Sequence, residues 1–294
     1  MLCALLLAGL AMPQAAAPAA VTRSVTVAVY SKKSEPVADL KAEEVSVAED
    51  GKKRTVLSVV PDRRPLEVAV VVDSSAVMAS SYRSDLVSAV TAFWKALAPG
   101  SRIAVWTSGP PSNVVAFGAD SATAEPRLQA VAPAGKNYAL DALLDAARGM
   151  TGSGDVRRVL VYVGGSDIEG SQSRSAEMVR AIGQAGATPM IVLITGGAAA
   201  SSVPGGPTAG SSFTTDMQGY FEQVAAGYRG SCAVVLSTLA ARKALQDVAA
   251  DLGSQYRVRY ESVAGDPPPP KVEVRRKGTK TRVGRTQVEV LKAE

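Results

Sequence analysis

The chain has 294 residues, of which 47% are hydrophobic and 20% charged, and its formal net charge is +5. This length suits one large domain or two of ordinary size, and the apolar content excludes a largely disordered chain. The sequence contains no histidine and only two cysteines. Histidine triads, histidine-bound metal centres, zinc knuckles, iron–sulfur clusters and disulfide frameworks are therefore excluded.

Residues 1–19 have the composition of a secretory signal. An apolar run from Leu2 to Met12 is followed by small residues, and the best cleavage site lies after Ala19. The run is shorter than the ~20 apolar residues that span a bilayer. No Lys or Arg precedes it, so a start further upstream and a short hydrophobic tail stay open as alternatives. We expect an exported protein without a membrane span.

The segment 20–64 predicts β-strands. Residues 21–30 alternate apolar and polar side chains and are rich in Val and Thr, which is the strand pattern. Two further strands are expected within 40–60, divided at Asp50-Gly51, a dipeptide typical of hairpin turns. Pro65 marks the end of this N-terminal β segment.

Residues 65–254 predict an α/β domain. Residues 66–73 form an apolar run without alternation, which indicates a strand buried on both faces in a parallel sheet. Further buried strands then alternate with amphipathic helices, which favours a doubly wound, mainly parallel sheet with helices on both faces. The expected strands are 102–109, 113–118, 157–165, 188–197 and 232–237, and the expected helices are 86–97, 138–150, 175–186, 216–230 and 239–253.

The segment 255–294 returns to strand pattern, with alternation over 256–262 and a turn at Lys277-Gly278. Because strands that are distant in sequence can pair, we expect 20–64 and 255–294 to form one small β module. Residues 271–285 carry seven basic side chains and one acidic one. They fit either an anionic partner such as nucleic acid or a hairpin whose charges protect a strand edge. Aromatic stacking partners are missing, which favours the hairpin and no nucleic acid.

Polar side chains follow the first buried strand of the α/β domain, in VVVDSSAVM (70–78). Asp73, Ser74 and Ser75 would lie at the carboxyl end of that strand, where open α/β sheets bind ligands. Carboxylate and hydroxyl oxygens are the ligands that hard divalent cations prefer.

This segment resembles the metal-ion-dependent adhesion site, Asp-x-Ser-x-Ser, of the von Willebrand factor A domain. The surrounding sequence is similar to a bacterial family related to that domain, and the ordered series of motifs covers nearly the whole mature chain. The motifs are VTVAVY, Pro36-Val37, LKAEEVSVAEDG, PLEVAVVVDSS, GKNYALDAL, VLVYVGGSDIEGS and DLGSQYRVRY. The resemblance implies an A-domain fold, a divalent-cation site and a contact face for another protein.

The chain departs from the family's ligand pattern. Asp73 and Ser75 match the first two ligands, but Val77 stands at the second Ser position. Asn137 stands at the Thr position and Gly165 at the second Asp position.

Asp167 lies two residues beyond Gly165 and could contribute an oxygen only if its loop rearranged. We therefore predict a weak, vestigial metal site of Asp73, Ser75, Asn137 and Asp167 and no cofactor. The alternative is a Mg²⁺ or Ca²⁺ ion held by these four residues.

The sequence therefore predicts an exported, non-enzymatic binding or scaffold protein. By resemblance, it would contact another protein through the loops at the carboxyl ends of the strands. These loops are 74–82, 109–112, 133–138, 164–172 and 198–212. A metal-dependent adhesion receptor is the alternative function.

An α/β enzyme is disfavoured because no nucleophile–base pair is visible. We interpret Asp141 and Asp145 as solvated helix charges rather than a catalytic pair. Trp94 and Trp106 are expected in the core, and Cys232 is expected to be a small buried hydrophobe.

Overall fold

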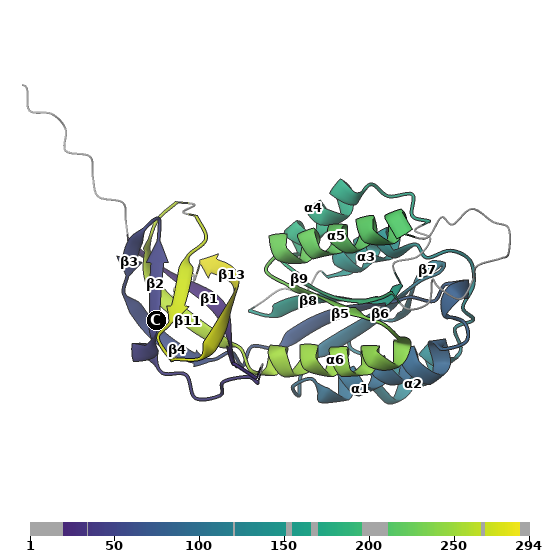
Figure 1. Cartoon of the computed structure of the whole chain (residues 1–294), viewed down its shortest axis with the longest axis horizontal. Coiled ribbons are helices and arrows are strands. Elements are labelled where there is room, and N and C mark those ends of the chain that lie inside the picture. Colours follow the sequence, from purple (N-terminus) through teal and green to yellow (C-terminus); the bar gives the residue numbers. More distant parts are fainter. Residues whose placement is uncertain are drawn as a thin grey trace, which may run out of the picture.

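The computed structural model describes residues 20–33, 35–119, 121–150, 155–165, 170–195, 211–265 and 268–288. These residues form a β module and an α/β unit, which lie beside one another in Figure 1. The expected signal (1–19), Asp167 and most of loop 198–212 lie outside the described residues. None of the described helices combines the length and the hydropathy that a bilayer crossing requires.

The α/β unit is built on a six-stranded sheet with the order β10-β9-β8-β5-β6-β7. Its strands run parallel except β7, which is antiparallel to β6. Every residue of β5 is buried, as its nearly continuous apolar sequence predicts for a central strand. The strands are β5 (Leu66–Val72), β6 (Arg102–Ser108), β7 (Pro111–Val115), β8 (Arg157–Gly165), β9 (Thr188–Ile194) and β10 (Ser231–Val235).

Helices cover both faces of this sheet, which confirms the predicted doubly wound α/β fold (Figure 1). One face packs against α1 (Ser88–Ala96), α2 (Ser121–Gln129) and α6 (Thr238–Gly253). The other packs against α3 (Ala139–Gly149), α4 (Ser175–Ala185) and α5 (Ser211–Gly227). A 3₁₀ turn η2 (Ala76–Met78) and a π-helical turn η3 (Tyr82–Val87) connect β5 to α1.

Two details of the α/β unit differ from the sequence prediction. Helix α2 was not expected, because its amphipathic pattern is weak and, among its described side chains, only Ala124 and Leu128 are buried. Cys232 is half-buried on the edge strand β10 rather than fully buried. Trp106 lies in the core on one face of the sheet, as predicted, and Trp94 is partly buried against the core on the other face.

The β module combines strands from both ends of the chain. A four-stranded antiparallel sheet has the order β13-β1-β11-β4, and a three-stranded sheet has the order β12-β2-β3. Valine and tyrosine side chains from both sheets, among them Val27, Val47 and Tyr260, form its separate core. Its elements are β1 (Ala20–Ser31), η1 (Ala42–Glu44), β2 (Val45–Glu49), β3 (Lys52–Arg54), β4 (Val56–Pro61), β11 (Tyr256–Val263), β12 (Lys271–Val274) and β13 (Thr279–Val288).

The predicted hairpin at Asp50-Gly51 is present. Both residues have positive φ, 53° and 70°, as a two-residue hairpin turn of the primed type requires. The single strand expected after this turn is instead divided at Thr55, because β3 pairs with β2 while β4 pairs with β11 of the other sheet.

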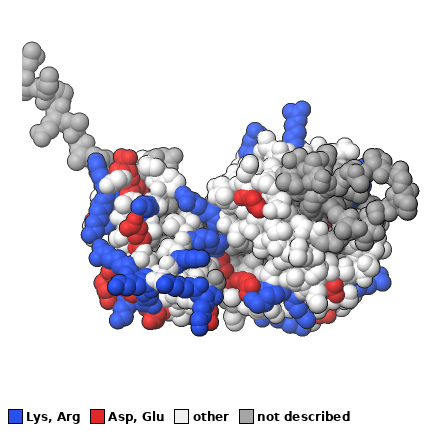
Figure 2. All heavy atoms as spheres, viewed as in Figure 1, with Lys and Arg blue, Asp and Glu red and all other residues white. Residues whose placement is uncertain are grey.

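Lys and Arg side chains gather over the β module in the view of Figure 2. The surface of the α/β unit that is turned to the viewer is mostly uncharged. The basic segment 271–285 does not form the expected hairpin, because β12 pairs with β2 whereas β13 pairs with β1 of the other sheet. Arg276 lies between these two strands and binds Asp39 and, at 2.6 Å, Glu44. The Arg276 guanidinium lowers the pKa of Glu44 to about 2. These ion pairs connect the turn between β12 and β13 to η1 and to the segment before it.

Candidate functional site

The candidate site lies at the carboxyl end of the central strand β5. Asp73 follows this strand directly, and its backbone N–H donates to the carbonyl oxygen of Val163 in the neighbouring strand β8 (2.9 Å). Asp73, Ser74 and Ser75 are all buried. Parallel strands bring Asp73 next to Gly164 and Gly165 at the end of β8, so the sheet register itself assembles the site.

Both carboxylate oxygens of Asp73 accept hydrogen bonds from the protein. Oδ1 accepts from the backbone N–H of Ser75 at 2.9 Å. Oδ2 accepts from the backbone N–H of Gly165 at 2.9 Å and from Nδ2 of Asn137 at 3.1 Å. Burial nevertheless raises the pKa of Asp73 above its ordinary value, because removal from water disfavours the charged form more than these bonds favour it.

Asn137 is the centre of the network. Besides Asp73, its Nδ2 approaches the hydroxyl oxygen of Tyr162 (2.8 Å) and the carbonyl oxygen of Gly165 (3.2 Å). Its Oδ1 accepts from the Ser108 hydroxyl at 2.7 Å. The amide therefore turns its nitrogen toward Asp73, and its oxygen, the atom that could bind a cation, is used by Ser108.

Tyr162 completes the network and was not predicted from the sequence. Its hydroxyl donates to the carbonyl oxygen of Gly165 at 2.8 Å while its ring is fully buried and stacks on Phe221. The available signal was a tyrosine inside an apolar strand, since a buried tyrosine hydroxyl needs a polar partner.

Two glycines allow the close packing of the site. A Cβ on Gly164 would lie 2.6 Å from the Tyr162 hydroxyl oxygen and closer still to Cβ of Asp73. A Cβ on Gly109 would lie 2.8 Å from the carbonyl oxygens of Ala134 and Lys136. The loops around Asp73 are thus pressed together, and only residues without a side chain fit at these two positions.

Three of the four predicted metal ligands, Asp73, Ser75 and Asn137, lie together, and Asp167 is outside the described residues. Val77 is 44% exposed beside them. Within the described part of the chain, no three Cys, Asp or Glu residues are grouped as a metal site would need. Both oxygens of the single carboxylate here accept N–H bonds, whereas a divalent cation is usually held by several oxygen ligands.

Asp141 has a structural contact that the sequence did not predict. Its carboxylate accepts hydrogen bonds from the backbone N–H groups of Gln172 (3.0 Å) and Ser173 (2.8 Å). Burial tends to raise the pKa of Asp141, but these bonds outweigh it and the pKa is lowered. Asp141 therefore connects the start of α3 to the segment before α4 through hydrogen bonds, whereas the sequence predicted a solvated side chain.

No family model matches this sequence, and no curated protein matches it. Among solved structures, a von Willebrand factor type A protein from Catenulispora acidiphila is similar at 10% identity with a TM-score of 0.48, over 94% of this chain and 75% of that one. The VWA domain of SpRpn10 is similar at 13% identity with a TM-score of 0.42, over 59% of this chain and 88% of that one.

The manganese-loaded TRAP protein of Plasmodium vivax is similar at 10% identity with a TM-score of 0.45, over 78% of this chain and 97% of that one. These neighbours are von Willebrand factor A domains. They belong to the family that the sequence motifs resemble. At such low identity they concern the fold alone, and the fold assignment rests on the strand order given above.

Proposed function

We propose that this chain is an exported, non-enzymatic binding protein. It would contact another protein through the carboxyl edge of its six-stranded sheet, without a divalent cation. One observation carries the proposal: each oxygen of the Asp73 carboxylate is bound by protein N–H groups, and the Asn137 amide nitrogen lies where a neighbouring ligand oxygen would be needed.

Exposed apolar side chains support this edge as the contact face. Leu236 and Leu239 follow the carboxyl end of β10 and are 80% and 72% exposed, and Val77 follows β5. Since β5 and β10 run in the same direction, these residues belong to one edge of the sheet. Leu and Val side chains that are not covered within a monomer commonly mark protein contacts when they gather at one edge.

The chemistry of the edge supports binding rather than catalysis. The hydroxyls of Ser108 and Ser74 are engaged, with Asn137 and with the Gly109 carbonyl oxygen respectively. Among these serines and Ser75, only Ser75 and Ser108 have a side chain nearby that could act as a base, and that side chain is Asp73, whose two oxygens already accept backbone N–H bonds. The chain has no histidine. An activated nucleophile needs such a base within about 3 Å.

The contact face is tested by site-specific photocrosslinking in the exporting cell. A photoreactive amino acid at Val77 or Leu239 should give a discrete crosslinked protein. The matched control is the same amino acid at Leu57, which is 45% exposed on β4 of the β module. Equal crosslinking from Leu57, or none from Val77 and Leu239, contradicts the proposed face.

Cation independence is tested by the same crosslinking with and without a chelator, and by calorimetric titration with Mg²⁺ and Mn²⁺. We expect the crosslinks to persist in the chelator and no micromolar binding of either ion. Micromolar binding that Asp73→Ala abolishes would favour the metal-dependent receptor instead. Export is tested separately, by cell fractionation and by sequencing the N-terminus of the mature protein, which should begin at Ala20.

A further inference from the structure

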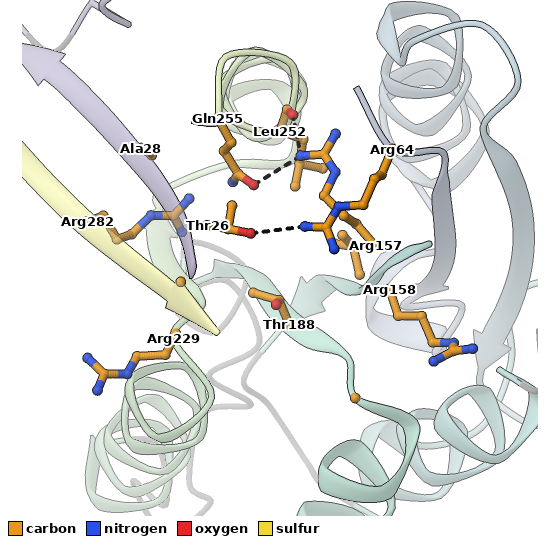
Figure 3. Close-up of a pocket in the computed structure, with 13 residues that line it drawn as sticks. Thr26, Ala28, Arg64, Arg157, Arg158, Thr188, Arg229, Leu252, Gln255 and Arg282 are labelled. Atoms are coloured by element: carbon orange, nitrogen blue, oxygen red, sulfur yellow. Dashed lines mark hydrogen bonds between the residues drawn. The ribbon is translucent and has the colours of Figure 1, made fainter. Parts of the chain in front are cut away.

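A cleft lies between the β module and the α/β unit, at the opposite edge of the sheet from Asp73. Arg157 and Thr188 begin strands β8 and β9, so the cleft adjoins the amino ends of the parallel strands. Figure 3 shows the guanidinium groups of Arg64, Arg157 and Arg282 directed toward Thr26 and Gln255 from three parts of the chain. Arg158 and Arg229 lie at its margin with their charged ends turned away.

Arg157 is more than nine-tenths buried and incompletely paired. Its Nη1 donates to the carbonyl oxygen of Leu252 (2.9 Å) and to Oε1 of Gln255 (3.1 Å). Its Nε is buried, forms no hydrogen bond within the described residues, and lies 3.8 Å from Oδ1 of Asp62. Burial and the neighbouring Arg64 lower the pKa of Arg157, and Asp62 only partly offsets them. A buried cationic donor without an acceptor is costly, and its usual explanation is a bound water or ion.

The carboxylates around the cleft are fewer than the arginines. Asp62 pairs with Arg64 at 2.6 Å and must also balance Arg157. Two other acids each form ion pairs with two arginines. Asp155 pairs with Arg64 and Arg257. Glu67 pairs with Arg102 and Arg158. Arg282 has its own partner, Asp251. The walls of the cleft therefore carry an excess of positive charge.

We propose that this cleft binds a tetrahedral oxyanion, the phosphate or sulfate group of a small ligand. The cavity has a volume of about 50 Å³. A water molecule needs about 10–15 Å³ of such space, so the cavity has room for one small ion. Arg282 approaches from one side of the cleft and Arg64 and Arg157 from the other (Figure 3), which suits an anion with oxygens on several sides, whereas a planar carboxylate presents only two.

The bound oxyanion would connect the two parts of the molecule. Arg282 lies on β13 of the β module, Arg157 lies on β8 of the α/β unit, and Arg64 lies in the segment that joins β4 to β5. A ligand that contacts all three resists separation of the two parts and raises the midpoint of thermal unfolding. This inference does not depend on the proposed contact face, which lies at the other edge of the sheet.

The test is titration of the full chain with inorganic phosphate and with sulfate, at constant ionic strength set by sodium chloride. We expect saturable binding with a Kd on the order of 1 mM or tighter, and a rise in the unfolding midpoint that chloride alone does not give. Glycerol 1-phosphate forms a third arm: binding of this ester indicates a phosphorylated ligand, and binding of the inorganic ions alone indicates a free ion.

Two variants and one matched control decide whether the cleft is the site. Arg282→Gln should weaken phosphate binding at least tenfold, and Arg157→Lys, which keeps the buried charge, should weaken it because a lysine loses the fork of donors. Arg127→Gln makes the same charge change as Arg282→Gln on an exposed position of α2 and should leave binding unchanged. Absence of saturable binding, or equal loss in Arg127→Gln and Arg282→Gln, overturns the proposal.

Discussion

The two edges of the six-stranded sheet differ in how completely their buried charged groups are hydrogen-bonded. At the carboxyl edge, Asp73 has a donor for each of its oxygens, and Asn137 uses both its nitrogen and its oxygen. At the amino edge, Arg157 keeps a buried Nε without a hydrogen bond among the described residues, in a wall where arginines outnumber acids. A satisfied polar network stabilises the fold without a bound ion, whereas an unsatisfied one is a place where a bound ion gains free energy.

The largest expected effect is at the satisfied edge. Gly164→Ala should destabilise the protein by about 3 kcal/mol, because the new methyl group overlaps Asp73 and the Tyr162 hydroxyl and forces them apart. Chemical denaturation measures the loss. The control is Gly219→Ala in α5, where a Cβ meets nothing within 4 Å and the helix gains up to about 1 kcal/mol. Equal effects at the two positions would contradict the close packing described for the site.

Removal of the central amide should have the next largest effect. Asn137→Ala leaves Ser108, Tyr162 and Asp73 with fewer partners in a buried site, at a cost of about 2 kcal/mol. Asn113→Ala is the matched control, since Asn113 is exposed and its side chain donates to the Val115 carbonyl oxygen at 3.2 Å. A loss at Asn137 no larger than at Asn113 would show that the network contributes little to the folded state.

Removal of Arg157, whose Nε has no hydrogen bond within the described part of the chain, should destabilise the protein less than removal of Asn137. Arg157→Met loses two hydrogen bonds but also a buried donor without a partner and a like charge beside Arg64. We expect a loss of about 1 kcal/mol or less in chloride buffer, measured by the same denaturation. If Arg157→Met loses more free energy of unfolding than Asn137→Ala, the polar network at the amino edge is the more stabilising one, and the comparison is reversed.

The smallest expected effect is at the half-buried thiol of β10, outside both networks. Burial raises the pKa of Cys232 to about 11, and Glu222 adds to the shift. Since an unfolded cysteine has a pKa of about 8.5, the folded protein holds this proton more tightly, and stability should fall as the pH rises between these values.

The thiol titration is measured by the rate of alkylation as a function of pH, in a Cys3→Ala background. We expect the alkylation rate to increase with pH, with the midpoint of the increase near pH 11. A plateau near pH ~8.5 would show an exposed, unperturbed thiol. Cys232→Ser serves as the control for modification elsewhere and should abolish the signal.

Features set by neighbouring residues could be predicted from the sequence. The Asp50-Gly51 turn depends on two adjacent backbone conformations, and β5 could be predicted because a nearly continuous apolar run suits a strand with two buried faces. Helix α2 lacked such a local signal, since its amphipathic pattern is weak and its sequence contains Pro126.

The candidate sites depend on contacts that no local pattern encodes. Asp73 and Asn137 were predicted to meet, but the direction of the Asn137 amide follows from Tyr162 and Ser108, which reach it from two other strands. The arginine cleft was missed altogether. Arg64 and Arg282 are far apart in sequence, and each resembles an ordinary surface charge until the β module folds against the α/β unit.

The pairing of β1 with β11 has a consequence for synthesis of the protein. Ala20 is aligned with Val263, so β1 cannot pair with β11 until nearly the whole chain has left the ribosome. At roughly 5–20 residues per second this delay is on the order of 10–50 seconds. The α/β unit contains all its own strands and can form during that time, while the valine-rich first strand stays available to chaperones.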